Sequence, residues 1–190
     1  MCIRDRLQPG YILPNGMPSD PLDVKSKMFK LKKNWQSLPP GPERSRYEFD
    51  YLNWPVDLGA PWDDNNNDGI YTLGIDNPRI LGEETLFFVA NDLDSARSTF
   101  TYGSNPIGLE LQVTTFGYNS ELLKDVVFKK FKIINKSEND ITDMYLSYWA
   151  DDDLGFANDD FVGCDTLLNL GYTYNAVSYT HLTLPTSDLV

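Results

Sequence analysis

Oxygen-bearing side chains alternate along Asp64–Asp68, which reads DNNND. Calcium is bound by about six to eight oxygen ligands, and alternate side chains of a tightly coiled loop can converge on one ion. Asp64, Asn66 and Asp68 have this spacing, and the glycine that follows them permits a sharp turn. The carbonyl of Ile70 can supply a fourth oxygen while its side chain packs inward. The spacing therefore predicts a calcium loop.

The second half of this loop departs from an EF-hand. Ile75 occupies the position of the bidentate Glu, and Asp76 follows one residue later. Pro61 and Pro78 bracket the loop, so flanking helices are not expected. We predict a loop of EF-like geometry that Asp76 closes as a further ligand. The alternative is a plain polar turn, since consecutive Asn residues such as Asn65–Asn67 are common in turns.

A second group of carboxylates follows the predicted strand Met144–Trp149. At about 4 Å, two like charges cost about 1 kcal/mol even in bulk water, and a bound cation would remove that cost. The alternative is a solvated acidic loop, because this group matches no fixed ligand spacing. The metal ligands predicted here are Asp151, Asp153, Asp159, Asp160 and Asp165.

No catalytic residue is predicted. The one histidine is His181, which lies in a terminal segment discussed below, as does Cys2. Residues 7–176 therefore lack histidine-based triads, zinc–histidine sites and imidazole bases. Cys164 has no histidine to activate it, which favours a structural thiol. Two aspartates could form a glycosidase pair, but nothing in the sequence marks one of them as a shielded acid.

The overall charge restricts the partners. The 190 residues include 16 basic and 28 acidic side chains, for a net charge of −12. Nucleic acids and anionic membranes need a positive surface, so neither is an expected partner. No apolar run approaches the roughly 20 residues of a membrane-spanning helix, so membrane insertion is not expected. Cations, above all calcium, are the partners that this composition favours.

The two ends of the chain are related at the level of DNA. MCIRD at residues 1–5 and VSYTH at residues 177–181 can be encoded by one short DNA element and its reverse complement. The element resembles the transposase end used in preparing sequencing libraries. We therefore expect residues 1–6 and 177–190 to be adapter-derived and to carry no fold information. On this hypothesis the natural segment is a C-terminally truncated part of a longer protein.

The remaining sequence predicts a mainly β fold, an antiparallel β-sandwich. Residues 7–40 contain many prolines and are expected to be irregular, whereas residues 41–176 form the calcium-loop-containing domain. One short helix is expected within Gly41–Asn53, because Pro42 suits a first helical turn. Alternating or β-branched runs predict the strands. They are Thr85–Ala90, Leu109–Phe116, Val126–Asn135, Met144–Trp149 and Leu167–Tyr174.

Several stretches resemble extracellular proteins of Bacteroidota-type bacteria that are uncharacterised in activity and end in a type IX secretion sorting domain. The resemblance covers roughly Gly41–Asn175. The matching stretches are LPPGPERSRYEFDYLNWPVDLGAPW, DDNNNDGIYTLGIDNP, FFVANDLDSARSTFTYGSNPIGLELQVTTFGYN, VFKKFKIINKS and DDDLGFANDDFVGCDTLLNLGYTYN. It implies export and residence outside the cell or on its surface, where calcium is plentiful, but no activity.

These observations favour a calcium-stabilised, non-catalytic β-domain of a secreted or cell-surface protein. The alternative is a carbohydrate-binding or glycoside hydrolase-like module with polysaccharide as its partner. The aromatic residues, among them Trp35, Trp54, Trp62 and Trp149, suggest that alternative, because sugars stack on exposed rings. Core filling is the other explanation for them. An aromatic row on one exposed sheet face would favour sugar binding.

Overall fold

The computed structural model of the chain describes residues 7–148, 150, 154–155 and 159–175. The chain forms two compact units that meet in the sequence between Met144 and Tyr145, and each is described here by itself. The prediction of a mainly β fold with antiparallel sheets is confirmed. Asp151 and Asp153 lie outside the described residues, as does Trp149.

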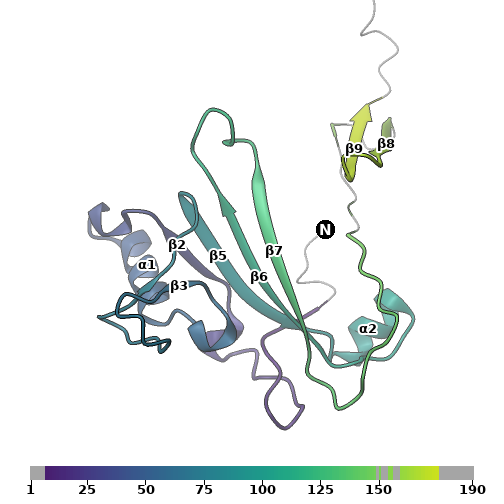
Figure 1. The fold of residues 1–190 in the computed structure, drawn as a ribbon, viewed down its shortest axis with the longest axis horizontal. Coiled ribbons are helices and arrows are strands. Elements are labelled where there is room, and N and C mark those ends of the chain that lie inside the picture. The colour runs from purple at the N-terminus through teal and green to yellow at the C-terminus, as the bar shows by residue number, and fades with distance from the viewer. Residues whose placement is uncertain (1–6, 149, 151–153, 156–158, 176–190) are drawn as a thin grey trace, which may run out of the picture. The chain divides into compact units, whose positions relative to one another are not determined.

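The first unit is built on a five-stranded antiparallel sheet (Figure 1). Strand β5 (Glu84–Asn91) is its centre: it pairs on one side with β1 (Gln8–Pro9) and β2 (Phe29–Lys32). On its other side β5 pairs with β6 (Leu109–Gly117), which in turn pairs with β7 (Val127–Asn135). A two-stranded sheet of β3 (Trp62–Asp63) and β4 (Asn77–Pro78) accompanies it.

Two α-helices and three single-turn helices join these strands. Helix α1 (Pro42–Leu52) begins with proline, as predicted, and lies beside β2 (Figure 1). Helix α2 (Ser95–Tyr102) was not predicted; Asp94 caps it by accepting a hydrogen bond from the Arg97 N–H. The single turns are η2 (Val24–Ser26), η3 (Trp35–Ser37) and η4 (Val56–Leu58).

The hydrophobic core lies between β2, β5 and the segment that follows α1. Phe87 and Val89 both lie on the buried face of β5, because side chains two residues apart on a strand point to the same side. They pack with Phe29 of β2 and with Trp54, whose ring meets that of Phe29 edge-on at 6.2 Å. The Trp54 Nε1–H donates to the Pro61 carbonyl at 2.8 Å. Since this buried indole is paired, the segment after α1 is held over the sheet.

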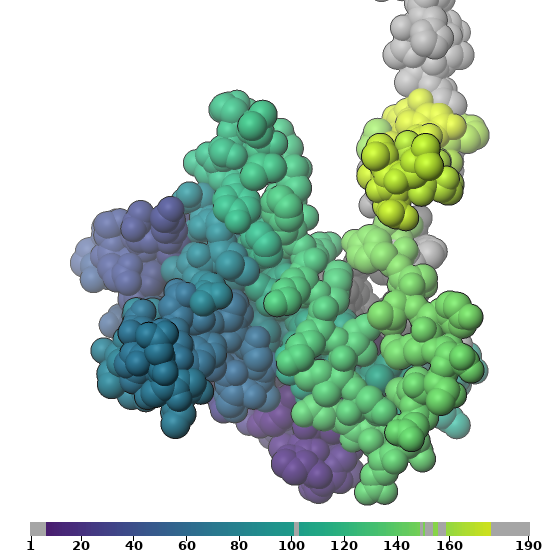
Figure 2. Space-filling model, viewed as in Figure 1, coloured from purple at the N-terminus to yellow at the C-terminus, as the bar shows by residue number. Residues whose placement is uncertain are grey.

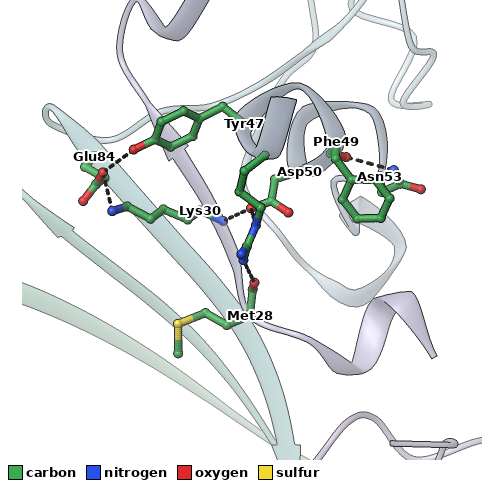
Figure 3. A network of polar contacts seen from close by, with 8 residues as sticks. Met28, Lys30, Tyr47, Phe49, Asp50, Asn53 and Glu84 are labelled. Carbon is green, nitrogen blue, oxygen red and sulfur yellow. Dashed lines mark hydrogen bonds and ion pairs between the residues drawn. The ribbon is translucent and has the colours of Figure 1, made fainter. Parts of the chain in front are cut away.

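Helix α1 is attached to the sheet by a polar network (Figure 3). The Tyr47 hydroxyl donates to Glu84 at 3.0 Å, and the Lys30 ammonium lies 2.9 Å from the same carboxylate. Asp50 is 2 % exposed and accepts hydrogen bonds from the Lys30 N–H and from Arg46, both at 3.0 Å. Burial raises the pKa of the Asp50 carboxyl, although its hydrogen bonds to Lys30 and Arg46 oppose that shift.

The N-terminal segment is held by a buried carboxylate on β6. Glu110 is 1 % exposed and accepts a hydrogen bond from the Ile12 N–H at 2.8 Å. The Gln112 side-chain amide donates to the other oxygen of Glu110 at 3.1 Å. Asn91 of β5 donates to the Gly10 carbonyl at 2.9 Å. Residues expected to be irregular thus contribute β1 and β2 to the sheet and are fixed to it.

The second unit contains a hairpin of β8 (Asp160–Asp165) and β9 (Leu170–Asn175). The predicted strand Leu167–Tyr174 corresponds largely to β9. Strand β8 was not predicted, because it lies within the acidic cluster. Residues 144–148 of the predicted strand Met144–Trp149 form no strand.

The Tyr47–Glu84 contact gives the first unit a dependence on alkaline pH. Burial, followed by the hydrogen bond to Glu84, raises the pKa of Tyr47. The unfolded chain therefore loses this proton first, at a pH near 10, and the folded state becomes less stable as pH rises beyond that point. Tyr47→Phe should lose about 1 kcal/mol at neutral pH and show a shallower loss above pH 10.

Urea denaturation followed at pH 8 to 11 measures this difference. Tyr145→Phe is the control, because Tyr145 is 94 % exposed. Parallel stability curves for Tyr47→Phe and the unmodified chain would contradict the assigned role of this hydroxyl.

Candidate metal centre

Residues 64–76 form a loop whose two ends are joined by a short ladder. Trp62 pairs with Pro78 and Asp63 with Asn77 in the two-stranded sheet of β3 and β4. Strands rather than helices therefore flank the loop, in agreement with the bracketing prolines. The Trp62 and Tyr71 rings meet edge-on at 5.6 Å, and the Tyr51 hydroxyl donates to Asn77 at 2.7 Å. The base of the loop is thus tied to α1.

Backbone N–H groups orient the carboxylates in the first half of the loop. The two oxygens of Asp64 accept from the N–H groups of Asp68 at 3.2 Å and Gly69 at 2.8 Å. Asp68 accepts from the Ile70 N–H at 2.7 Å, and the Asn66 amide oxygen accepts from the Asp68 N–H at 3.3 Å. Gly69 has φ 75°, a left-handed conformation that suits glycine. The chain therefore coils around these oxygens.

Asp76 closes the loop through backbone amides. Its carboxylate is fully buried, with 0 % exposure, and accepts from the Asn65 N–H at 2.9 Å and the Thr72 N–H at 2.7 Å. The Asn65 side chain donates to the Ile75 carbonyl at 2.8 Å. An ionised carboxylate has about four acceptor positions, so these two bonds leave lone pairs available. Asp76, which lies one residue after the position of the bidentate Glu in an EF-hand, thus joins the two halves of the loop.

The loop presents a mixed set of oxygen donors. No three carboxylate, histidine or cysteine side chains gather at one point in the described parts of the chain. The oxygens that the loop could offer an ion belong to the carboxylates of Asp64, Asp68 and Asp76, the amide of Asn66 and the carbonyl of Ile70. The Ile70 side chain is 66 % exposed, so the expectation that it packs inward was wrong. Hard oxygen donors of this kind suit calcium or magnesium rather than zinc.

The structure separates two described carboxylates of the second cluster, Asp160 and Asp165. Asp165 accepts from the N–H groups of Leu167 at 2.9 Å and Leu168 at 3.0 Å, in the turn of the β8–β9 hairpin. Asp160 is at the opposite end of β8, five residues away, which is about 16 Å along a strand. The structure therefore does not bring Asp165 together with Asp160.

Three oxygens at the open end of this hairpin accept no hydrogen bond. They are the Oδ1 atoms of Asp159, Asp160 and Asn175, and all three are buried. Asp160 and Asn175 face each other across the hairpin. Leu154 links them, donating its N–H to Asp160 at 2.9 Å and accepting from the Asn175 amide at 2.6 Å. Buried acceptors without donors are costly unless a cation or water occupies the space beside them.

Aromatic side chains are divided between core and surface. Trp35 and Trp54 are buried, so these two fill the core. On the β8–β9 hairpin, Phe161 and Tyr174 are paired residues whose rings stack at 5.9 Å. The Tyr172 ring lies 6.0 Å from that of Tyr174 on the same face. All three are about half exposed and form a row, which the sequence pattern alone did not identify.

Comparison with known proteins supplies no family for this chain. Neither a protein-family model, nor a curated protein, nor a solved structure matches it. Within the residues that the structure describes, no helix has the length and apolar character needed to span a bilayer.

The role of Asp76 can be tested without metal. In the presence of a chelator, Asp76→Ala should lower the free energy of unfolding by about 1–3 kcal/mol, because two part-buried backbone N–H groups lose a charged acceptor. Asp76→Asn keeps one acceptor and should lose less. Urea denaturation measures both variants.

Asp125→Asn is the matched control, since Asp125 is exposed at the β6–β7 turn and forms no hydrogen bond or ion pair with a described residue. If Asp76→Ala unfolds at the same urea concentration as the unmodified chain, Asp76 does not hold the loop together.

Proposed function

We propose that this chain is a calcium-stabilised, non-catalytic β-domain of a secreted or cell-surface protein, with the ion bound by the loop of residues 64–76. One observation carries the proposal: backbone N–H groups hold the Asp64 and Asp68 carboxylates at alternate positions of one coiled loop. Such a loop keeps its oxygens in place before the ion arrives, which lowers the ordering cost of binding.

The ion would stabilise the domain through the contacts of the loop. The β3–β4 ladder and the Tyr51–Asn77 hydrogen bond connect the loop to the rest of the first unit. A ligand that binds only the folded chain adds stability in proportion to the logarithm of its concentration over Kd. Extracellular modules bind calcium with Kd about 10⁻⁴–10⁻³ M, which fits a surface loop with few carboxylates.

A second ion at the β8–β9 hairpin is supported by a different observation. The Oδ1 atoms of Asp159, Asp160 and Asn175 are buried without donors, and a cation would satisfy them. Asp151 and Asp153 were predicted as further ligands and stay a prediction.

Carbohydrate binding is the second candidate function, and the aromatic row of the hairpin favours it. Rings of Phe161, Tyr172 and Tyr174 share one face, and their exposed fractions are 50 %, 49 % and 47 %. A sugar ring can lay its C–H face on such a row. Ring pairs also stabilise a hairpin by themselves, so binding has to be measured.

The calcium proposal is tested by thermal unfolding. In about 2 mM calcium the chain should be more stable than in chelator by roughly 0.6–1.8 kcal/mol, and its Tm should rise by about 1–7 °C. Asp68→Asn keeps the shape of the side chain but removes one charge, so the rise should fall to less than half. Asp125→Asn should respond like the unmodified chain, since it removes an equal charge far from the loop in sequence.

Two results would count against the loop as the site. One is an unchanged Tm with millimolar calcium. The other is a calcium response that survives in Asp68→Asn and disappears in Asp160→Asn, which would assign the ion to the hairpin.

The sugar candidate is tested by affinity electrophoresis in gels that contain neutral polysaccharides. If the aromatic row binds a polysaccharide, Tyr174→Ala should migrate faster than the unmodified chain in a gel whose polysaccharide slows the unmodified chain. Val162→Ala is the matched control, because Val162 is on the other face of the same hairpin and is 81 % exposed. Equal migration of all three proteins in every gel would exclude the candidate.

A further inference from the structure

A pocket of about 320 Å³ lies on the face of the five-stranded sheet, between the strands and residues 56–62. It belongs wholly to the first unit and includes none of the predicted calcium ligands. Its lining combines apolar, neutral polar and cationic side chains, among them Trp62, Arg79, Phe87, Gln112, Lys130 and Lys132. A volume of this size and a mixed lining are typical of sites for small organic ligands.

Strand register places two lysines at this pocket. Lys130 and Lys132 are two residues apart on β7, so their side chains lie on the same face of the sheet. They are opposite Thr114 and Gln112 of β6, which also line the pocket. Space for an anion therefore lies beside two ammonium groups that point from the same strand face.

These two lysines differ from most cations of the chain. Lys25, Lys30 and Lys124 form ion pairs with carboxylates at 2.6 to 2.9 Å. The side-chain ammonium groups of Lys130 and Lys132 form no hydrogen bond or ion pair with any described residue. In a chain with a net charge of −12, two unpaired ammonium groups at one pocket concentrate positive potential where a ligand would lie.

The third cation is already oriented. The Arg79 guanidinium donates from Nε to Asp63, and its side chain is 52 % exposed. This pairing holds the planar group at the pocket and leaves its terminal amino groups available for an oxyanion. Because Asp63 offsets the charge of Arg79, the local excess of positive charge comes from the two lysines.

The remaining walls favour an organic anion over a bare inorganic one. Phe87 and Trp62 supply apolar surface, and Thr114 supplies a hydroxyl. The Gln112 side-chain N–H₂ is directed to the Glu110 carboxylate at 3.1 Å, which fixes the amide orientation. Apolar walls with a few placed polar groups match a ring or short chain that carries one charged oxyanion.

We infer that this pocket binds a small organic oxyanion, a carboxylate, sulfate or phosphate group carried on a ring with an apolar face. Lys130 and Lys132 bind the oxyanion, and Arg79 donates further hydrogen bonds to it. The apolar face of the ligand ring contacts the wall of the pocket that includes Trp62. The competing explanation is that lysines protect β7, since β7 pairs only with β6 among the described strands. That explanation requires no binding and makes no distinction between the two faces of the strand.

The test measures binding of four related sugars to the full chain after calcium has been removed with a chelating resin, so that neither calcium nor a soluble carboxylate chelator takes part. The probes are galacturonate, galactose 6-sulfate, galactose 6-phosphate and neutral galactose, with inorganic sulfate as a fifth. Heteronuclear NMR follows the Trp62 indole N–H, and isothermal titration calorimetry gives Kd. At least one charged sugar should bind about tenfold more tightly than galactose, because a charge-assisted hydrogen bond is worth that much.

Matched variants on one strand separate a pocket from general charge. Lys130→Gln and Lys132→Gln should each weaken binding about tenfold. Lys129→Gln should change Kd by less than about twofold, because Lys129 is on the opposite face of β7 and screened from the pocket. Circular dichroism of each variant confirms that it is folded.

Each outcome decides the inference. Preference for galacturonate, the sulfate ester or the phosphate ester identifies which oxyanion the pocket accepts. Equal affinity for charged and neutral sugars overturns it, as does equal weakening by Lys129→Gln. Absence of a Trp62 shift with all five probes at about 10 mM, where even weak sites with Kd near 1 mM are filled, also overturns it. None of these results depends on whether the loop of residues 64–76 binds calcium.

Discussion

Carboxylates that accept hydrogen bonds from backbone N–H groups hold the irregular parts of this chain in place. Glu110 accepts from the Ile12 N–H and fixes the N-terminal segment, and Asp50 accepts from Lys30 and fixes α1. Asp76 joins the two halves of the loop of residues 64–76. Asp92 accepts from the N–H groups of residues 107, 108 and 109 and closes the connection that contains α2. Buried backbone N–H groups need such partners wherever no strand supplies them.

The same chemistry connects the fold with the proposed calcium loop. The N–H groups that satisfy Asp64 and Asp68 come from the loop itself, so the loop is organised by the residues that would bind the ion. A carboxylate has more acceptor positions than one or two amides occupy, and a cation can use the rest. Some acidic residues of this chain thus have a structural role, and the calcium proposal would give others a second role as ligands. The net charge of −12 alone does not distinguish them.

Local patterns predicted the central strands well. TLFFVA and LELQVTTF match β5 and β6 within one residue at each end, because alternation and β-branched residues are properties of each segment. Strand β8 was missed, since its carboxylates were interpreted as ligands. Helix α2 was missed although Asp94 and Gly103 are suitable caps; Gly103 has φ 68°, a left-handed C-cap. These two caps were the sequence signal for α2. The segment between them is only weakly amphipathic, so its hydrophobic pattern did not indicate a helix.

Long-range partners were beyond what these patterns contain. Glu110 occupies a polar position in the alternation of β6, which predicts exposure, yet its side chain is 1 % exposed because Ile12 and Gln112 satisfy it. Asp76 was predicted as a metal ligand that closes the loop, and that role stays a prediction; the contacts by which its carboxylate joins the two halves of the loop are hydrogen bonds from the amides of Asn65 and Thr72. Such partners follow from tertiary contacts, and a single sequence does not show which amide meets which carboxylate.

The net charge of the chain does not predict the charge around a single pocket. The negative net charge argues against large polyanions, because their binding depends on potential over an extended surface. A small anion responds to the few charges within about a Debye length, roughly 8–10 Å. Arg79 follows β4, whereas Lys130 and Lys132 belong to β7, and only the packing of the segment around β3 and β4 on the five-stranded sheet brings them to one pocket. Local potential is thus a property of the fold, and a chain with a negative net charge can still hold a positive pocket.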